Sequence, residues 1–255
     1  MGRVIDIISD LGEGFGLYEA ADDASIIEIV SSASVACGFH AGDPRTMALA
    51  VNEAIKKGVG VGAHPGFPDL LGFGRRNISV TPWEVKTDVL YQLGALDAFV
   101  RVAGGKLQHI CPHGSLGDLS MVDTECAAAM LEAVIEFNPS LVIVTQTGEL
   151  ERLAREQGMK VAKLIFADRA YNDDGTLVSR RNPNAVLHDK DIVIERCVRM
   201  VLEGKVTTIT GKEITVDGES ILIHGDTVGS LALARDIKAA LIDKGVEIKR
   251  LADWL

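Results

Sequence analysis

Val35-Ala36-Cys37-Gly38-Phe39-His40-Ala41-Gly42-Asp43 is an apolar, strand-like run that ends in a cluster of histidine, glycine and aspartate. Similar runs with polar ends occur at residues 5–10, 59–65, 108–114, 164–169 and 221–226. Stretches of helical length separate them, and alternating strands and helices predict a parallel sheet. Because α/β proteins place their active sites at the ends of such strands, the sequence predicts an α/β enzyme.

The same clusters favour one of the two architectures that a parallel sheet allows. A doubly wound open sheet concentrates its site at one switch point, whereas a barrel can draw on every strand. Seven strand-like runs are present and most end in reactive residues, so a barrel is favoured. The 255 residues suit a single barrel domain over 1–255. Val206 to Gly218 predicts a β-hairpin inserted near 205–219.

Composition excludes several classes of function. The net charge of −10 argues against a nucleic-acid partner, because phosphate binding requires clustered Lys and Arg. No run approaches the length of a membrane helix and no leader segment is visible, so a cytoplasmic protein without a membrane partner is expected. The four scattered cysteines are expected to be reduced thiols.

Eight side chains at strand ends are candidates for catalysis. The acid–base candidates are His40, His64, His113 and His224, and the carboxylates that would orient them or activate water are Asp10, Asp43, Asp168 and Asp226. Taken singly, each histidine is equally well explained as a structural residue, and Asp43 as the N-cap of a helix that begins at Pro44. Their repeated placement is what favours a catalytic interpretation.

Three further residues are candidates for binding the substrate. Glu13 lies in a glycine-rich loop that would let the backbone approach a ligand. Arg75 lies on the long loop 65–77 and could close over an anion. Arg169 could hold a carboxylate through its planar fork, although a structural ion pair is an equal alternative.

Cys111 is a weak nucleophile candidate, and a buried inert thiol explains it better.

Standard cofactor motifs are missing from the sequence. It contains no GxxxxGK[ST] phosphate loop, GxSxG elbow, HExxH motif or CxxC pair. Histidines and acids together are compatible with a divalent metal, but no spacing identifies one.

In this order, the motifs resemble the LamB/YcsF family. The matching stretches are 10–16, 36–44, 62–69 with 72–75, 112–114, 166–171 with 174–177, and 224–227. The resemblance implies an incomplete, seven-stranded TIM-like (β/α) barrel of the glycoside hydrolase/deacetylase type. It also implies ATP-dependent opening of the 5-oxoproline lactam to glutamate, together with companion B and C subunits of the 5-oxoprolinase type. ATP is implied by the resemblance alone.

Five positions depart from the family's pattern. Asn, Asn, Lys, Tyr and Glu of the pattern are replaced by Gly12, Ser34, Cys111, Gly117 and Leu164. Each change removes a polar group at or near a strand end. The leading hypothesis is therefore a hydrolase of a cyclic amide, with 5-oxoproline as the default substrate. The alternatives are a paralogue that hydrolyses a different lactam or ring amide, and a catalytically weakened regulatory or binding subunit.

Overall fold

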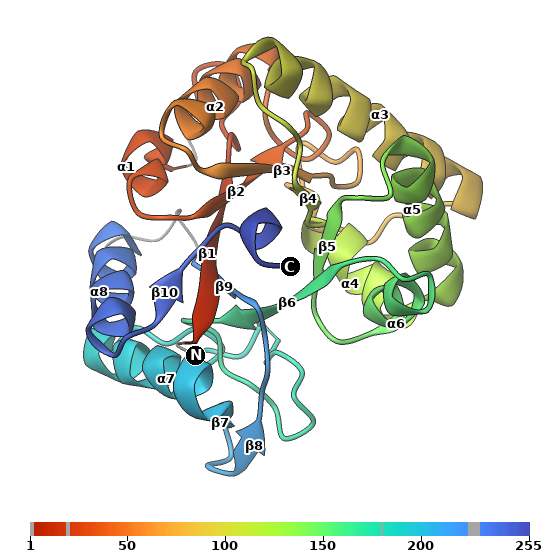
Figure 1. Cartoon of the computed structure of the whole chain (residues 1–255). Coiled ribbons are helices and arrows are strands. Elements are labelled where there is room, and N and C mark those ends of the chain that lie inside the picture. Colours follow the sequence, from red (N-terminus) through yellow and green to blue (C-terminus); the bar gives the residue numbers. More distant parts are fainter. Residues whose placement is uncertain (1–2, 19–20, 180, 224–229) are drawn as a thin grey trace.

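The computed structural model describes residues 3–18, 21–179, 181–223 and 230–255 (Figure 1). Its central feature is a sheet of parallel strands. In order around the sheet they are β1 (Val4–Leu11), β2 (Ser32–Ala36), β3 (Gly60–His64), β4 (His109–Ile110), β5 (Val142–Thr145), β6 (Val161–Phe166) and β9 (Ser220–Leu222). These seven strands form a barrel, which confirms the predicted α/β barrel class.

The barrel is closed, so the expectation of an incomplete barrel was wrong. Strand β9 pairs in parallel with β6 and also with β1, where Asp6 lies opposite Ser220. The eight residues of β1 provide the reason. Residues 6–8 of β1 pair with β9, whereas residues 8–11 pair with β2. This stagger of one strand between its two neighbours is what the closure of a barrel requires.

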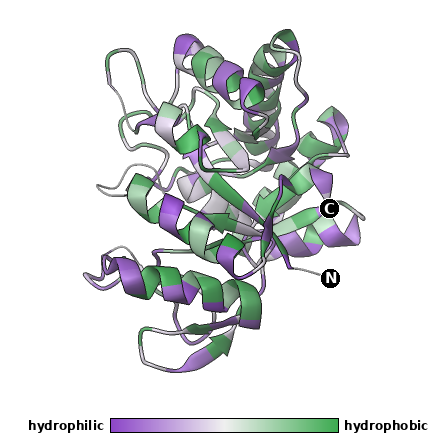
Figure 2. Ribbon diagram, turned by 60° about the vertical axis from the view of Figure 1, so that its left-hand side comes forward, coloured by the Kyte–Doolittle hydropathy of each residue, from purple (hydrophilic) through white to green (hydrophobic). Residues whose placement is uncertain are grey.

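Helices cover the outside of the barrel (Figure 1). They are α1 (Asp23–Ile27), α2 (Pro44–Lys56), α3 (Pro82–Val102), α4 (Gly114–Val122), α5 (Thr124–Phe137), α6 (Glu149–Glu156), α7 (Lys190–Glu203) and α8 (Ser230–Asp243). Figure 2 shows hydrophilic and hydrophobic residues side by side along these helices. In α2, Met47, Ala50, Val51 and Ala54 are buried, a helical spacing that presents one apolar face to the strands.

Local sequence signals explain where several helices begin. Thr81 and Glu84 form a complete capping box at the start of α3. Asp43 caps α2, whose first residue is Pro44. Between α7 and β9 the chain forms an antiparallel pair, β7 (Lys205–Thr207) and β8 (Glu213–Thr215). This pair projects from the barrel near α7 (Figure 1).

Two apolar clusters lie on opposite sides of the strands. The larger one packs strand residues such as Ile7 and Ile143 against the helices. The smaller one contains their neighbours on the other strand face, among them Ile8 and Val142. Because side chains alternate along a strand, the smaller cluster fills the barrel interior.

The C-terminal segment covers the end of the barrel where the strands begin. Strand β10 (Glu247–Ile248) pairs with Val4 and Ile5 at the start of β1. The 3-10 helix η1 (Leu251–Asp253) follows, and Leu251 joins the interior cluster with no exposed surface. Figure 1 shows this helix over the middle of the barrel. The opposite end, where the strands finish, carries the candidate site residues.

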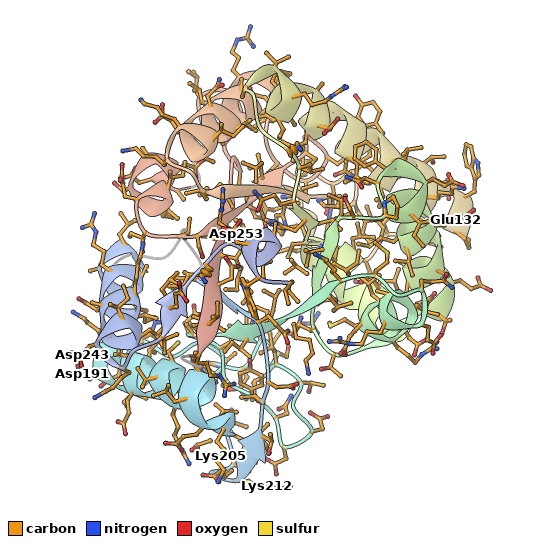
Figure 3. All side chains as sticks on the ribbon, in the orientation of Figure 1. Glu132, Asp191, Lys205, Lys212, Asp243 and Asp253 are labelled. Carbon is orange, nitrogen blue, oxygen red and sulfur yellow. The ribbon has the colours of Figure 1, made fainter. Side chains whose placement is uncertain are left out.

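Charged side chains are prominent on the outer elements. Figure 3 labels several of them on α5, α7, α8 and the β7–β8 segment, including Glu132, Asp191 and Lys205. Lys86 of α3 contacts Glu132 and Glu136 of α5 at 2.8 Å, which ties two neighbouring helices together. Among the described residues, no helix combines the length and apolarity needed to cross a membrane.

Candidate active site

Four strand ends bring together a compact group of histidines and acids. Asp10 lies on β1, and Glu13 follows that strand. His40 lies in the turn between β2 and α2, His64 ends β3, and His113 is the N-cap of α4 just after β4. Asp10, Glu13, His64 and His113 line a cavity of 1010 Å³, whereas His40 is buried behind them.

The carboxylate of Glu13 faces all three imidazole rings. Its Oε1 lies 3.2 Å from Nε2 of His40, 3.5 Å from Nδ1 of His113 and 3.9 Å from Nε2 of His64. One ligand atom from each of these four residues falls within 4.8 Å of the others, so the group is compatible with a divalent metal ion. We call Glu13, His40, His64 and His113 the histidine cluster.

Backbone carbonyls fix the orientation of two of the rings. Nδ1 of His64 donates to the carbonyl of Cys111 at 2.7 Å, and Nε2 of His113 donates to the carbonyl of Phe73 at 2.9 Å. A carbonyl can only accept, so each of these two nitrogens carries a hydrogen. The remaining nitrogens, Nε2 of His64 and Nδ1 of His113, are 2.9 Å apart. In the neutral rings both are lone-pair atoms that point at each other.

The third ring, His40, stacks on His113. Their ring centroids are 3.8 Å apart and the planes differ by only 4°. Burial, together with the nearby His113 and His64, holds the pKa of His40 well below its usual value. The ring is therefore neutral at neutral pH. Its Nδ1 is buried and has no hydrogen-bond partner among the described residues.

The loop 65–77 contributes a backbone carbonyl and an arginine to the site. Phe73 has a φ of 54°, an uncommon value for a residue other than glycine, and Gly74 follows with a φ of 62°. This left-handed pair aims the Phe73 carbonyl at His113, so the strained backbone lies beside the candidate site. Arg76 is paired with the buried carboxylate of Asp69, which anchors the loop to itself.

Arg75 is the exposed cation of this loop at the cavity. It lines the cavity and its guanidinium carbon lies 5.0 Å from the centroid of the Phe73 ring. Within residues 3–18, 21–179, 181–223 and 230–255, no ion pair holds Arg75. Its charge therefore remains available to an anionic ligand.

Asp10 is a buried acceptor at the edge of the cluster. Its Oδ1 is 3.3 Å from Nε2 of His64, yet it receives no hydrogen bond from any described residue. The neighbouring cavity wall is apolar and includes Leu164, Phe166 and Leu222. Cys111 also lines it, and burial raises the pKa of this thiol well above its usual value. Cys111 therefore remains a thiol and not a nucleophilic thiolate.

The structure does not bring every candidate into the cluster. The carboxylate of Asp43 accepts hydrogen bonds from the amides of Gly16, Arg45 and Thr46, so it caps α2 and holds the preceding loop. These bonds lower its pKa to about 2. Asp168 follows β6. Burial lowers the pKa of Arg196 of α7, and the negative charge of Asp168 partly offsets this effect. His224 and Asp226 lie outside the described residues.

Arg169 lines the cavity but is largely engaged with the backbone. Its Nε donates to the carbonyl of Ala185 and its Nη2 to that of Val178, at 3.3 and 2.8 Å. The residue is 7% exposed. Its guanidinium therefore organises the segment after β6, which limits what it can offer to a substrate.

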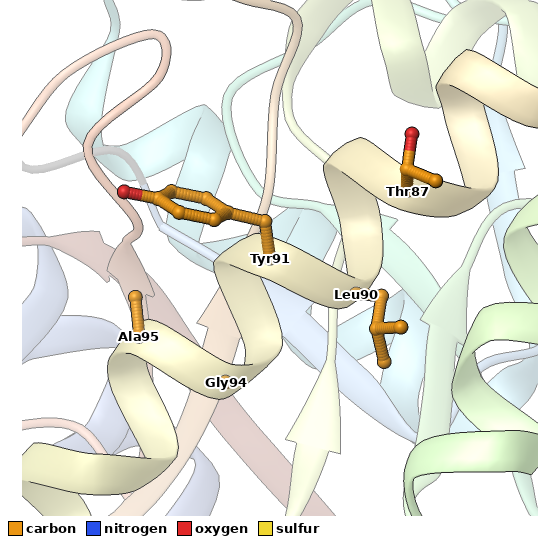
Figure 4. Close-up of a pocket in the computed structure, with 5 residues that line it drawn as sticks. All are labelled: Thr87, Leu90, Tyr91, Gly94 and Ala95. Carbon is orange, nitrogen blue, oxygen red and sulfur yellow. The ribbon is translucent and has the colours of Figure 1, made fainter.

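Some residues at the cavity were not identified from the sequence. Asp118 of α4 and Arg181 also line it. Arg181 lies in an irregular segment whose sequence carries no strand or helix pattern, so no signal placed it there. A separate depression on the outer face of α3 is lined by Thr87, Leu90, Tyr91, Gly94 and Ala95 (Figure 4). It contains no acid or histidine and offers no acid–base pair.

Known proteins resemble this chain along nearly its whole length. The model of the LamB/YcsF family matches residues 5–255. The A subunit of 5-oxoprolinase from Natranaerobius thermophilus is 45% identical over 253 residues, covering 99% of this chain and 98% of that protein. The A subunit of 5-oxoprolinase from Clostridium beijerinckii is 46% identical over 245 residues, covering 96% of each.

Solved structures agree with the fold. The crystal structure of a lactam utilization protein from Thermus thermophilus superposes with a TM-score of 0.93 at 41% identity, covering 97% of this chain and 100% of that chain. A protein of Enterococcus faecalis superposes with a TM-score of 0.57 at 14% identity, covering 98% of each, which reflects the fold alone.

Proposed function

The chain belongs to the LamB/YcsF family, and we propose that it hydrolyses a cyclic amide, with 5-oxoproline as the default substrate. The observation that carries this proposal is the histidine cluster beside Asp10 at the mouth of a large cavity. Relatives named as the A subunit of 5-oxoprolinase match the chain from end to end, and a similar structure is that of a lactam utilization protein.

The reaction requires two proton transfers that these residues can perform. Water must lose a proton as it attacks the ring carbonyl, and the ring nitrogen must gain one as the C–N bond breaks. The Oδ1 atom of Asp10 has no donor of its own among the described residues, so it suits the role of base toward water. Asp10 can then pass the same proton to the ring nitrogen, while His64 and His113 hold the attacking water at the cluster. We assign His40 to the support of Glu13 and His113.

A substrate that carries a carboxylate needs a cation in the cavity. Arg75 suits this role because its guanidinium lines the cavity and no ion pair engages it among the described residues. Arg169 is the second candidate, although two of its nitrogens already donate to carbonyls. Either arginine would orient the ring of 5-oxoproline through its fork of N–H donors.

We further propose that ATP and companion subunits take part. The names of the relatives describe an A subunit, which fits a complex with B and C subunits of the 5-oxoprolinase type. The family resemblance is the support for ATP, and an ATP-consuming reaction fits the cytoplasm. Asp43, Asp168, His224 and Asp226 are further proposed contributors to the reaction.

A specific observation favours a second candidate function, the hydrolysis of a different lactam. Leu164, Phe166 and Leu222 form an apolar wall at the cavity, and Cys111 adds a neutral thiol. A less charged ring amide would lie against such a wall at a lower desolvation cost than a carboxylate-bearing ring.

One assay separates these functions. The chain is incubated with and without its companion subunits and ATP, with 5-oxoproline and with 2-pyrrolidinone, the same ring without the carboxylate. Formation of glutamate supports 5-oxoproline as the substrate, and turnover of 2-pyrrolidinone alone supports the second candidate. No turnover of any lactam, with intact binding of the companion subunits, contradicts both and leaves a regulatory role.

The variant Arg75→Met tests the carboxylate site within the same assay. We expect it to raise KM for 5-oxoproline about tenfold or more, because a charge-assisted bond is lost. Turnover of 2-pyrrolidinone serves as the matched control, since that ring has no carboxylate to lose. An unchanged KM for 5-oxoproline would remove Arg75 from this role.

A further inference from the structure

We propose that His64, His113 and Glu13 bind one divalent transition-metal ion of the zinc class, with a water molecule in an open position toward the cavity. The ligand atoms are Nε2 of His64, Nδ1 of His113 and Oε1 of Glu13. This binding follows from the geometry of the cluster and does not depend on the choice of substrate.

The first argument is the pair of facing lone pairs. Both rings donate their other nitrogen to a backbone carbonyl, so Nε2 of His64 and Nδ1 of His113 have no hydrogen to share in the neutral state. Two acceptors 2.9 Å apart repel each other unless a proton or a metal ion lies between them. A metal ion bound to both nitrogens removes this repulsion, and carbonyl-bound N–H groups are the usual support of histidine ligands.

The second argument is the spacing of the three ligand atoms. Their separations are 2.9, 3.5 and 3.9 Å. A triangle with these sides has a circumscribed circle with a radius of about 2.0 Å, so one point in its plane is that far from all three atoms. Zinc bonds to nitrogen and oxygen ligands are about 2.0–2.2 Å long. An ion in the triangle, or slightly out of its plane, fits without movement of the side chains.

The third argument is the chemistry of the donors. Two imidazoles with one carboxylate form the ligand set of catalytic zinc sites that keep a position open for water. Calcium and magnesium prefer oxygen ligands throughout, so the set selects against them. His64, His113 and Glu13 all line the cavity, which leaves the open position accessible to a substrate.

His40 has a different role from the three ligands. Its Nδ1 has no acceptor among the described residues, whereas a histidine ligand normally donates its second nitrogen. Its Nε2 lies 3.2 Å from Oε1 of Glu13 and its ring stacks on His113. His40 is therefore a positioning residue that holds one ligand by a hydrogen bond and another by stacking.

Asp10 completes the arrangement. Its Oδ1 lies 3.3 Å from Nε2 of His64 and is an unsatisfied acceptor among the described residues, so it can take a hydrogen bond from a water on the ion. A metal ion lowers the pKa of its bound water, which supplies hydroxide near neutral pH. This catalytic use of the ion, unlike its binding, rests on the proposed function.

Metal binding is tested on the full chain after treatment with a chelator. Titration calorimetry with Zn²⁺, Co²⁺ and Mg²⁺ is expected to give one site for Zn²⁺ and Co²⁺ and at least 100-fold weaker binding of Mg²⁺. The visible spectrum of the Co²⁺ protein reports the ligands directly. His64→Ala and Glu13→Gln are expected to weaken Zn²⁺ binding more than about 100-fold. His40→Ala should weaken it about 10- to 100-fold, as for residues that support ligands.

A matched control and a folding readout keep the test decisive. His188 lies outside the cluster and does not line the cavity, so His188→Ala should bind Zn²⁺ with unchanged affinity. Circular dichroism reports whether each variant is folded. The inference is overturned if the folded wild-type chain binds no Zn²⁺ stoichiometrically. It is also overturned if His64→Ala and Glu13→Gln, both folded, bind Zn²⁺ as tightly as the wild type.

Asp10→Asn distinguishes the failure of this inference from that of the proposed function. We expect this variant to bind Zn²⁺ within about threefold of the wild type and to lose lactam turnover. For the wild-type chain with its companion subunits and ATP, zinc binding without turnover of any lactam would support the metal site and contradict the proposed function. Full turnover by the metal-free chain would contradict the catalytic use of the ion.

Discussion

Two glycines make the room in which buried imidazole rings lie. A Cβ atom on Gly62 would be 2.1 Å from the ring of His109 in the barrel interior. A Cβ atom on Gly74 would be 2.7 Å from Cβ of His40 and 2.9 Å from Cδ2 of His113. Gly74 also has a φ of 62°, which side chains disfavour. The packing of His40 and His113 in the histidine cluster therefore requires a glycine at position 74.

We expect Gly74→Ala to destabilise the protein and disturb the cluster. The matched control is Gly158→Ala, where φ is 71° and no atom would lie within 4 Å of the new Cβ. The control should lose about 1–2 kcal/mol of unfolding free energy from the left-handed backbone alone. Gly74→Ala should lose at least about 1 kcal/mol more in urea unfolding, because the packing around it must shift. Equal losses would show that the two rings can move aside without cost.

Asp6 is a fully buried carboxyl near the start of β1, toward the barrel end where the strands begin. Ser31 and Ser32 donate to its Oδ1 at 2.7 Å, and Ser220 donates to its Oδ2 at 2.6 Å. Burial raises its pKa from 3.8 to about 6, against the opposing effect of these hydroxyl groups. The folded protein thus holds this proton more tightly than the unfolded chain does.

This shift predicts a loss of stability as the pH rises. The contribution of Asp6 is fully present below pH 3.8 and disappears as the pH passes about 6. Relative to Asp6→Asn, which does not titrate, the wild type should lose about 2–3 kcal/mol between pH 4 and pH 7. Urea unfolding across this range measures the difference. Asp243→Asn is the control, because its side chain is 80% exposed. Parallel curves for wild type and Asp6→Asn would contradict the shift.

At the scale of elements, the two ends of the barrel have separate tasks. The carboxyl ends of β1, β2, β3 and β4, with the turns that follow them, carry the histidine cluster. The C-terminal strand β10 and helix η1 close the other end, where Leu251 packs among Ile8, Val142 and Ala162. Functional barrels show this division, with chemistry at the carboxyl ends of the strands and stability at the other end.

Leu251→Ala is expected to lower stability without altering the site. A buried leucine replaced by alanine leaves a cavity and costs about 2–5 kcal/mol. Leu71→Ala is the matched control, since Leu71 is 97% exposed and should change stability by less than about 0.5 kcal/mol. Thermal and urea unfolding measure both. If the Zn²⁺ affinity of folded Leu251→Ala fell in parallel with stability, the two ends would not be independent.

At the scale of the whole molecule, the thiols report on the integrity of the fold. Cys37, Cys111, Cys126 and Cys197 are all free and buried. Burial raises the pKa of Cys37 and of Cys197 to about 12. A thiol reagent reacts with the thiolate. In the native protein the four thiols are buried from the reagent and remain protonated.

We expect a thiol reagent such as Ellman's reagent to modify the native chain only slowly and to detect four thiols once urea unfolds it. The rate in native buffer then measures opening of the barrel. A reducing agent should leave the melting temperature unchanged, because all four cysteines of the sequence are free thiols. Fast reaction of one thiol in the native protein would reveal local opening around that cysteine.

Particular residues show how far the sequence could predict the structure. His40, His64, His113, Asp10 and Glu13 were identified from their places after apolar runs, and the structure gathers all five. Asp43 shows the limit of that reasoning. A carboxylate after a strand can equally act as the N-cap of the next helix, where it accepts hydrogen bonds from backbone amides. Arg169 shows another limit, since the backbone carbonyls of Val178 and Ala185, in the irregular segment that follows it, accept hydrogen bonds from its guanidinium.

The sequence alone determined the barrel class, the order of its elements and the barrel end that carries the candidate site residues, because apolar periodicity and turn residues are local properties. Only the tertiary structure decided that the barrel closes, since closure depends on the pairing of β1 with β9, two strands at opposite ends of the chain. It also decided which histidine nitrogens face each other. Those directions are set by the carbonyls of Cys111 and Phe73, which sequence spacing does not encode.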